Sequence, residues 1–291
     1  MRCLFALLLI LLPLISSHGQ RFRVATWNIE NAFDTLHDEG KDDFEFLPNA
    51  ERRWHSGRYW RKLRGITQTL AAMELPALVG IQEVENDTVL RDLTRRTALW
   101  TARYKYIITN SPDTRGVNVA LLYNPKVYSL LSWHAVRIPS QEHGLRPTRD
   151  ILVASGMVGK DTLHVCVVHL PSRRNNDKTT RRNRTLAVET LHSILDSVNV
   201  NNGEHIIQKQ AGRTYKRLSS QILLFSGTFT NKHDICIFCT HAKNYVMTGL
   251  TQTTAGTGAA NLFQLLPLHH PRFLLRLALR RRRWARIRER I

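Results

Sequence analysis

The stretch ALVGIQEV at residues 77–84 is the part of the sequence that says most about the fold of this chain. It is an apolar run of strand length that follows Pro76 and ends in a carboxylate, Glu83. The next residues, Asn86 and Asp87, are good helix caps, so the run has a clear end. A short apolar run bounded in this way is typical of a buried strand. The sequence therefore predicts a central strand that brings one acidic side chain to its end.

Helices and strands are expected on both sides of this stretch. The helical spacing of Leu63, Ile66 and Leu70 predicts a helix over residues 61–73, and residues 179–198 form a second amphipathic pattern. We expect strands at residues 21–29, 104–109, 117–123, 128–138, 150–157 and 163–170. Mostly antiparallel strands covered by helices indicate a layered α/β sandwich.

Two other predicted strands also end in polar side chains. The first strand runs into WNIEN at residues 27–31, which contains Asn28. A later apolar strand runs into VVHLPS at residues 167–172, which contains His169. Taken singly, Asn28 fits a turn, Glu83 a paired carboxylate, and His169 a buried histidine with its hydrogen bonds satisfied.

Together and in this order, these motifs resemble the endonuclease/exonuclease/phosphatase family, whose type member is deoxyribonuclease I. The resemblance covers residues 21–199. It rests on RVATWN at 23–28, QEV at 82–84, RGVNVALLY at 115–123, RPTRD at 146–150 and HLPSRR at 169–174. It implies an α/β fold, a four-layer αββα sandwich incomplete at the C-terminus, with the site at one end of the paired sheets.

The resemblance also implies a catalytic set of three residues. Glu83 would anchor Mg²⁺ or Mn²⁺, and Asn28 beside it would orient the phosphate or a metal-bound water. His169 would donate a hydrogen bond to a phosphoryl oxygen. These residue types suit the chemistry, because carboxylate and amide oxygens bind hard cations that neutralise charge on a phosphate.

Four more residues are expected to contact the substrate phosphate. Arg149 would supply a charge-assisted hydrogen bond, and Arg146, three residues earlier, is the alternative for that role. Asp113 and Asn118 stand where the family places polar groups that face the substrate.

The last third of the sequence departs from the family pattern. A strand ending in Gly-Asp-Phe-Asn should carry the residue that positions the attacking water. The matching segment is ILLFSGTFTN at residues 222–231, in which Thr228 and Thr230 replace the Asp and the Asn. A threonine hydroxyl is not a carboxylate base near neutral pH. The family's C-terminal Ser-Asp-His element has only LHHP at residues 268–271 as a counterpart.

Charge is distributed unevenly along the chain. Residues 21–198 contain 26 Lys and Arg against 20 Asp and Glu, a net charge of +6, whereas residues 199–291 contain 15 against 3, a net charge of +12. The Arg- and Leu-rich stretch at 272–291 is typical of a basic amphipathic helix or of a gene translated out of frame. Residues 200–291 are therefore interpreted as a divergent, out-of-frame or disordered tail.

The N-terminus predicts a secretory signal peptide over residues 1–19. Arg2 precedes an apolar run at 4–15, and small residues precede an expected cleavage site near Gly19. The run is short for a membrane span, although an uncleaved signal anchor stays the alternative. We expect a secreted or periplasmic monomer without stable membrane insertion.

Two functional hypotheses follow. The first is an exported, divalent-metal-dependent phosphodiester hydrolase. The domain charge of +6 favours nucleic acid as its substrate, and the family also hydrolyses inositol phosphates and sphingomyelin. The second is a catalytically inactive or truncated family member that binds phosphate-rich ligands.

Overall fold

The described part of the chain comprises most of the first two hundred residues and several later strands. The computed structural model describes residues 22–159, 161–171, 178–201, 206–210, 213–217, 221–227, 245–254 and 259–267, with backbone only from residue 198 onward. The predicted signal peptide, Thr228, Thr230 and residues 268–271 lie outside the described residues.

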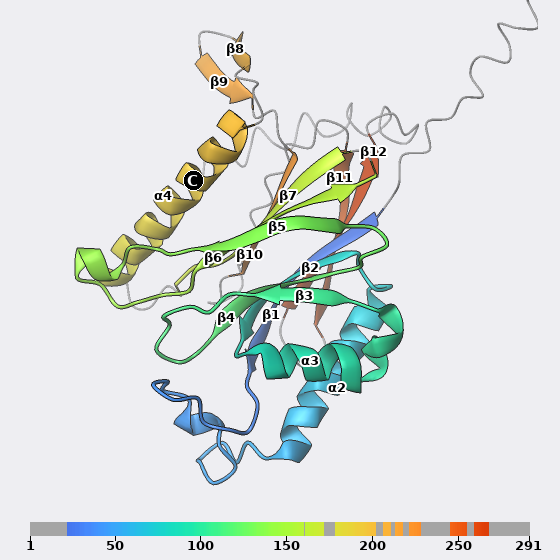
Figure 1. Ribbon diagram of the computed structural model, residues 1–291, viewed down its shortest axis with the longest axis vertical. Helices are drawn as coiled ribbons and strands as arrows, with labels where there is room; N and C mark the ends of the chain where they lie inside the picture. Colours follow the sequence, from blue (N-terminus) through green and yellow to red (C-terminus); the bar gives the residue numbers. More distant parts are fainter. Residues whose placement is uncertain are drawn as a thin grey trace, which may run out of the picture.

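Two sheets form the centre of the molecule (Figure 1). Their strands are β1 (Phe22–Ala32), β2 (Leu78–Val84), β3 (Lys105–Ile108), β4 (Asn118–Tyr123), β5 (Ser129–Val136), β6 (Ile151–Val158), β7 (Asp161–His169), β10 (Gln221–Gly227), β11 (Tyr245–Thr254) and β12 (Ala259–Pro267). One sheet has the order β11-β12-β1-β2-β4-β3, and the other has the order β10-β7-β6-β5. β1 and β2 pair in parallel, as do β7 and β10, and the remaining neighbours are antiparallel.

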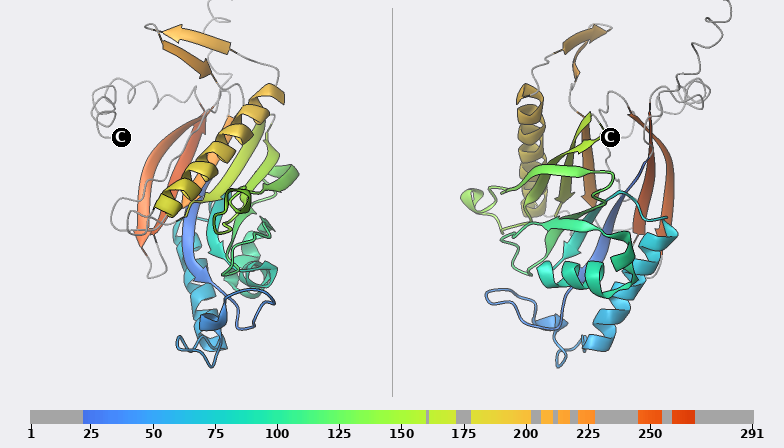
Figure 2. Two further views of the ribbon diagram at one scale, coloured as in Figure 1. Left: turned by 90° about the vertical axis from the view of Figure 1, so that its left-hand side faces the viewer. Right: turned by 45° about the vertical axis from the view of Figure 1, so that its right-hand side comes forward.

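Helices cover the outer face of each sheet, so the layers follow the order α, β, β, α (Figure 2). Helices α2 (Ser56–Ala72) and α3 (Asp87–Arg96) pack on the larger sheet, and α4 (Lys178–Asn201) packs on the smaller one. Strands β8 (Ile206–Gln210) and β9 (Arg213–Arg217) form a separate hairpin, and short 3-10 helices lie at Phe44–Phe46, Ala98–Ala102 and Gln141–His143. The predicted αββα sandwich is confirmed.

Alternation along the strands explains these layers. In β1, Ala25 and Trp27 face α2 and α3, whereas Val24 lies in the core between the sheets. In β7, Cys166 faces α4 while Val165 faces the core between the sheets. Because successive side chains point to opposite faces, strands with helices on one side and a sheet on the other must be apolar on both.

Caps set the starts of two helices. α2 begins at Ser56, earlier than the expected residue 61, because the His55 imidazole accepts a hydrogen bond from the Gly57 backbone N–H at 3.2 Å. α3 begins after Asn86 as predicted, where the side-chain Oδ1 of Asn86 accepts a hydrogen bond from the backbone N–H of Val89.

Strands from beyond residue 200 join both sheets. β12 pairs with β1 from Phe22 opposite Leu265 to Trp27 opposite Ala260. β10 lies beside β7 with Gly227 opposite His169, and it also contacts β1 and β2 across the core. The segment expected to hold the Gly-Asp-Phe-Asn strand is therefore a strand that ends next to His169. The predicted boundary at residue 199 stays a prediction.

Among the residues described, no helix is both long and apolar enough to span a membrane.

Candidate functional site

Glu83 lies in a β-bulge near the end of β2. The pairing of β2 with both β1 and β4 is interrupted at this residue, and its backbone is left-handed with φ of 63°. Glu30 and Asn31, at the end of β1, are also left-handed, with φ of 55° and 57°. Such residues cost about 1 to 3 kcal/mol each and gather where a site fixes the backbone. The bulge aims Glu83 out of the regular strand pattern.

The Glu83 carboxylate connects β1 with β7. Its Oε2 accepts a hydrogen bond from the Asn31 backbone N–H at 3.1 Å, and its Oε1 lies 3.6 Å from Nε2 of His169. The latter distance is too long for a hydrogen bond. Glu83 therefore holds the end of β1 in place and has one oxygen facing the imidazole.

His169 ends β7 and is buried. Burial, the charge of Arg149 and the charge of Arg115, in that order, lower the pKa of His169 well below 6.5. The imidazole is therefore neutral near pH 7, and its contact with Glu83 is not an ion pair. A neutral imidazole has one N–H to donate and one nitrogen that accepts.

Several buried polar atoms at these strand ends have no hydrogen-bond partner among the described residues. They are Nδ2 of Asn28, Oε1 of Gln82, Nε of Arg149 and Nδ1 of His169. Asn28 and Gln82 are register partners, and Arg149 contacts the chain at His169. A buried unpaired polar group costs about 1 to 3 kcal/mol, and folded proteins leave few of them. Their concentration at one place indicates a site that a polar ligand completes.

Arg149 braces the end of β7 from inside the protein. Its Nη1 donates to Oδ2 of Asp113 at 3.1 Å, and its Nη2 donates to the backbone carbonyls of His169 and Leu170 at 3.3 and 3.2 Å. Burial lowers the pKa of Arg149, and Asp113 opposes that effect. Three of the five N–H donors of Arg149 therefore bind the protein itself, which leaves Nε and one N–H of Nη1.

Arg115 is a site residue that the sequence reading did not select. Its Nη1 donates to Oδ1 of Asn31 at 3.3 Å, and its Nε lies 3.9 Å from Oδ1 of Asp113. Its guanidinium is about one third exposed. The adjacent Gly116 has a φ of 85°, a conformation that glycine adopts readily, so a glycine after an arginine is the feature of the sequence that fits this turn.

The other two expected phosphate contacts face protein groups. Asn118 accepts a hydrogen bond from the Ser111 backbone N–H at 2.7 Å and donates to the Glu85 carbonyl at 2.6 Å. It thereby fixes the loop before β4. Arg146 is exposed and donates to the hydroxyl of Thr114. The structure thus brings Asn28, Glu83 and His169 together, with Arg149 and Asp113 behind them.

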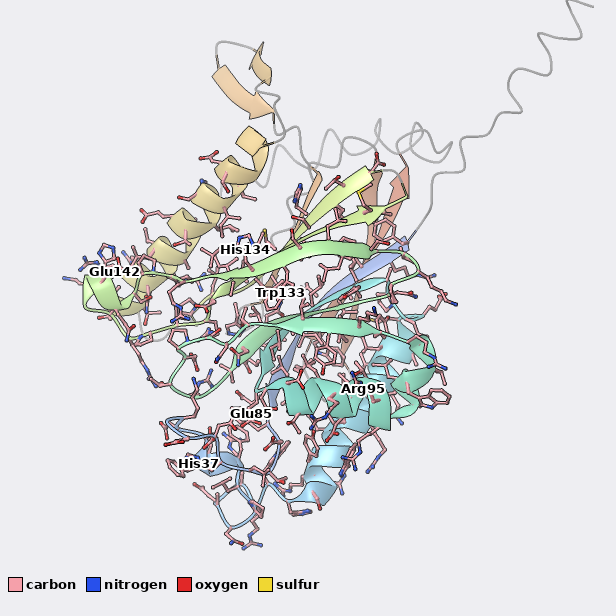
Figure 3. The ribbon with its side chains drawn as sticks, in the orientation of Figure 1. His37, Glu85, Arg95, Trp133, His134 and Glu142 are labelled. Atoms are coloured by element: carbon pink, nitrogen blue, oxygen red, sulfur yellow. The ribbon has the colours of Figure 1, made fainter. Side chains whose placement is uncertain are left out.

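A second carboxylate, Glu85, lies two residues beyond Glu83. Figure 3 shows it at the same end of the molecule as His37, which belongs to the loop between β1 and α2. Burial raises the pKa of Glu85 to about 9, the Asp34 backbone N–H lowers it, and the charges of three aspartates, Asp34, Asp38 and Asp43, raise it further. Glu85 is therefore protonated near pH 7.

The donor set suits a magnesium ion that keeps most of its water. In the part of the chain described, no group of three or more His, Cys, Asp or Glu side chains is arranged around a metal position. Mg²⁺ is commonly bound through one or two carboxylates together with waters and substrate phosphates. The Glu83 carboxylate fits that mode of binding. The Asn28 side-chain oxygen accepts a hydrogen bond from the Glu30 backbone N–H at 2.9 Å, and its unpaired Nδ2 is a donor suited to a phosphate or a metal-bound water.

Comparisons with known proteins agree on the fold. The humanized D. rerio TDP2 with 14 mutations has a TM-score of 0.56 and 11% identity, over 84% of this chain and 99% of that one. An endonuclease/exonuclease/phosphatase from Bacteroides vulgatus has a TM-score of 0.55 and 14% identity, over 85% and 99%. The human Nocturnin catalytic domain with bound sulfate has a TM-score of 0.54 and 12% identity, over 85% and 94%.

The sequence itself supplies the assignment to a family. A search of curated proteins gave no match. The model described as "Endonuclease/Exonuclease/phosphatase family" matches residues 23–208, which is more than half of the chain and includes Asn28, Glu83 and His169. The protein therefore belongs to the endonuclease/exonuclease/phosphatase family.

Proposed function

We propose that this protein is an exported, divalent-metal-dependent hydrolase of phosphodiesters, with nucleic acid as its substrate. The observation that carries the proposal is the convergence of Glu83, Asn28 and His169 at neighbouring strand ends, among buried polar atoms that have no partner in the described residues. A phosphate has the oxygens that such donors need. The export rests on the predicted signal peptide, and the choice of nucleic acid rests on the positive charge of residues 21–198.

Each of these residues has a distinct part in the proposed reaction. Mg²⁺ or Mn²⁺ at Glu83 would neutralise the charge that develops on the phosphoryl oxygens. The Asn28 amide donates to a phosphoryl oxygen, and the neutral imidazole of His169 donates a second hydrogen bond there. Arg115, partly exposed beside Asn31, adds a cation near the same phosphate. Arg149 keeps His169 in position through the carbonyls of β7.

A second candidate function is binding without hydrolysis. It is favoured by the sequence after β10, where Thr228 and Thr230 stand in place of the expected Asp and Asn. The last residue of β10, Gly227, lies opposite His169. A site with a metal anchor and phosphate donors but no base would hold a phosphodiester without activating water.

A hydrolysis assay separates the two candidates. The purified chain is mixed with a fluorescent oligonucleotide and with bis(p-nitrophenyl) phosphate, with Mg²⁺ or with EDTA. For the hydrolase we expect metal-dependent turnover that Glu83→Gln reduces by about 100-fold or more, the loss typical of removing a key electrostatic group. The matched control is Glu142→Gln, at an exposed glutamate in the 3-10 helix Gln141–His143.

The outcomes are distinct. Equal rates in Glu83→Gln and Glu142→Gln would show that any turnover comes from a contaminant or another site. Tight, saturable binding of the oligonucleotide by the wild-type chain without turnover would select the second candidate.

A further inference from the structure

A pocket of about 200 Å³ lies beside the candidate site, between the end of β1 and the start of α2. Glu30 and Asn31 form one side of it. Asn31 also donates its backbone N–H to Glu83 and accepts a hydrogen bond from Arg115. The pocket is therefore one residue away from the carboxylate that the proposed function assigns to the metal.

Three cations line the pocket: Arg52, Arg58 and Lys62. Arg52 pairs with Glu45 at 2.6 Å, whereas neither Arg58 nor Lys62 has a carboxylate within ion-pair distance among the described residues. Lys62 donates to the carbonyl of Glu30 at 3.0 Å, which uses one of the three donors on its ammonium group. The pocket that these three side chains line is here named the cation pocket. Its lining contains three positive side chains and one negative side chain, Glu30.

Lys62 is also coupled to the candidate site. Burial lowers the pKa of Lys62, and the negative charges of Glu30 and Glu83 act in the opposite direction. An anion in the pocket would provide this partly buried ammonium group with a negative partner at ion-pair distance, which no carboxylate of the described residues does, because a charge out of water needs a partner. Its position next to Glu83 suits a second negative group on the same ligand.

Aromatic packing holds the cation pocket in shape. Phe46 stacks on Phe33 at 4.0 Å, and Trp54 meets Phe46 edge-on at 5.9 Å and donates its indole N–H to the Phe33 carbonyl. The guanidinium of Arg52 lies over the Phe46 ring at 5.0 Å. The long connection between β1 and α2 is thereby fixed, so a ligand would meet cations that are already in place.

We propose that the cation pocket binds a second phosphate group of the substrate, next to the phosphodiester at Glu83. The proposal rests on the proposed function for the location of the first phosphate. The pocket is smaller than the roughly 300 to 1,000 Å³ of typical small-molecule sites, which suits one phosphate with its adjoining sugar or ring rather than a separate ligand. It selects substrates that carry several phosphates, such as a nucleic acid strand or an inositol polyphosphate, over single-phosphate lipids such as sphingomyelin.

Equilibrium binding in EDTA tests the pocket without any hydrolysis. A fluorescein-labelled oligothymidylate is titrated with the full chain, and anisotropy is followed at several salt concentrations. We expect Arg58→Gln to weaken binding by up to about fivefold, the value of an exposed charge contact, and to lower the salt slope by about 0.7, the value of one single-strand phosphate contact. Arg52→Gln is a second variant at the pocket.

Arg64→Gln is the matched control, since Arg64 is an exposed arginine on the same helix and does not line the pocket. If Arg58→Gln and Arg64→Gln change affinity and salt slope equally, the pocket is not a phosphate site. In a second experiment, unlabelled oligothymidylate and inositol hexakisphosphate serve as competitors of the labelled tracer. Each competitor is compared between the wild-type chain and Arg58→Gln. The competitor that displaces the tracer less well from Arg58→Gln identifies the source of the second phosphate. If Arg58→Gln weakens neither competitor, the proposal is overturned.

The pocket and the proposed function can fail separately. Binding that depends on Arg58 without metal-dependent turnover would refute the hydrolase and keep the pocket. If turnover depends on Glu83 but Arg58→Gln and Arg64→Gln change the kcat/KM for the oligonucleotide equally, the hydrolase is kept and the pocket is refuted.

Discussion

Replacing Arg149 by Met should destabilise the fold strongly, because the guanidinium is the counter-ion of a buried carboxylate. The side chains of Arg149 and Asp113 are 9% and 7% exposed, with Nη1 and Oδ2 3.1 Å apart. Removing one partner of a buried ion pair costs about 3 to 5 kcal/mol. Arg115 lies 3.9 Å from the other oxygen of Asp113 and offsets part of the loss, so we expect about 3 kcal/mol.

Urea unfolding followed by circular dichroism measures this free energy. In Arg149→Met/Asp113→Asn, the loss should be smaller than the sum of the single losses by about 2 kcal/mol, because the buried charge is then gone with its partner. Arg23→Met is the control, since the pair of Arg23 with Glu74 is 34% and 70% exposed and should contribute less than about 1 kcal/mol. An Arg149→Met loss no larger than that of Arg23→Met, or strictly additive losses, would refute a stabilising buried ion pair between Arg149 and Asp113.

Two further substitutions test the surroundings of the site and the core. The pKa of Glu85 is raised from 4.5 to about 9, so between these values the folded chain holds a proton that the unfolded chain has released, and stability falls as pH rises. Glu85→Gln should remove up to about 1.4 kcal/mol per pH unit from this decrease in the free energy of unfolding. Urea unfolding at pH 5.5 and pH 8 measures the effect. An equal decrease in the wild-type chain and the variant would contradict the prediction. A Cβ at Gly156 would lie 2.4 Å from the Tyr128 ring and 2.7 Å from the Ser129 carbonyl, so Gly156→Ala should cost about 1 to 3 kcal/mol, and an unchanged urea midpoint would disprove the clash.

Periodicity along the strands predicts much of the fold. Val24, Ala25 and Trp27 alternate between two buried faces, and this pattern is visible in the sequence. Glu83 and His169 each stand at the end of an apolar strand, but local pattern alone fits structural roles for both. Their assignment to one site follows from the resemblance to the family, and the structure places Glu83 Oε1 3.6 Å from His169 Nε2.

What could not be predicted depends on how loops turn. Neither the left-handed backbone of Glu83 and Asn31 nor the direction of Arg115 follows from apolar spacing. Asn118 looks like a substrate contact in sequence, yet its amide is hydrogen-bonded to the backbone of Ser111 and Glu85. The cation pocket depends on how Phe46 and Trp54 pack within the long connection that follows β1, which apolar spacing does not reveal.

The pairing of β12 with β1 and of β10 with β7 has a consequence for any shortened form of the chain. Without the residues after 199, β1 and β7 would both become sheet edges, and these are the strands that carry Asn28 and His169. Most buried residues of these two strands are apolar, and a long apolar edge recruits strands from other chains. Since β12 and β10 cover both edges, a chain that ends at residue 199 should self-associate more readily than the full chain.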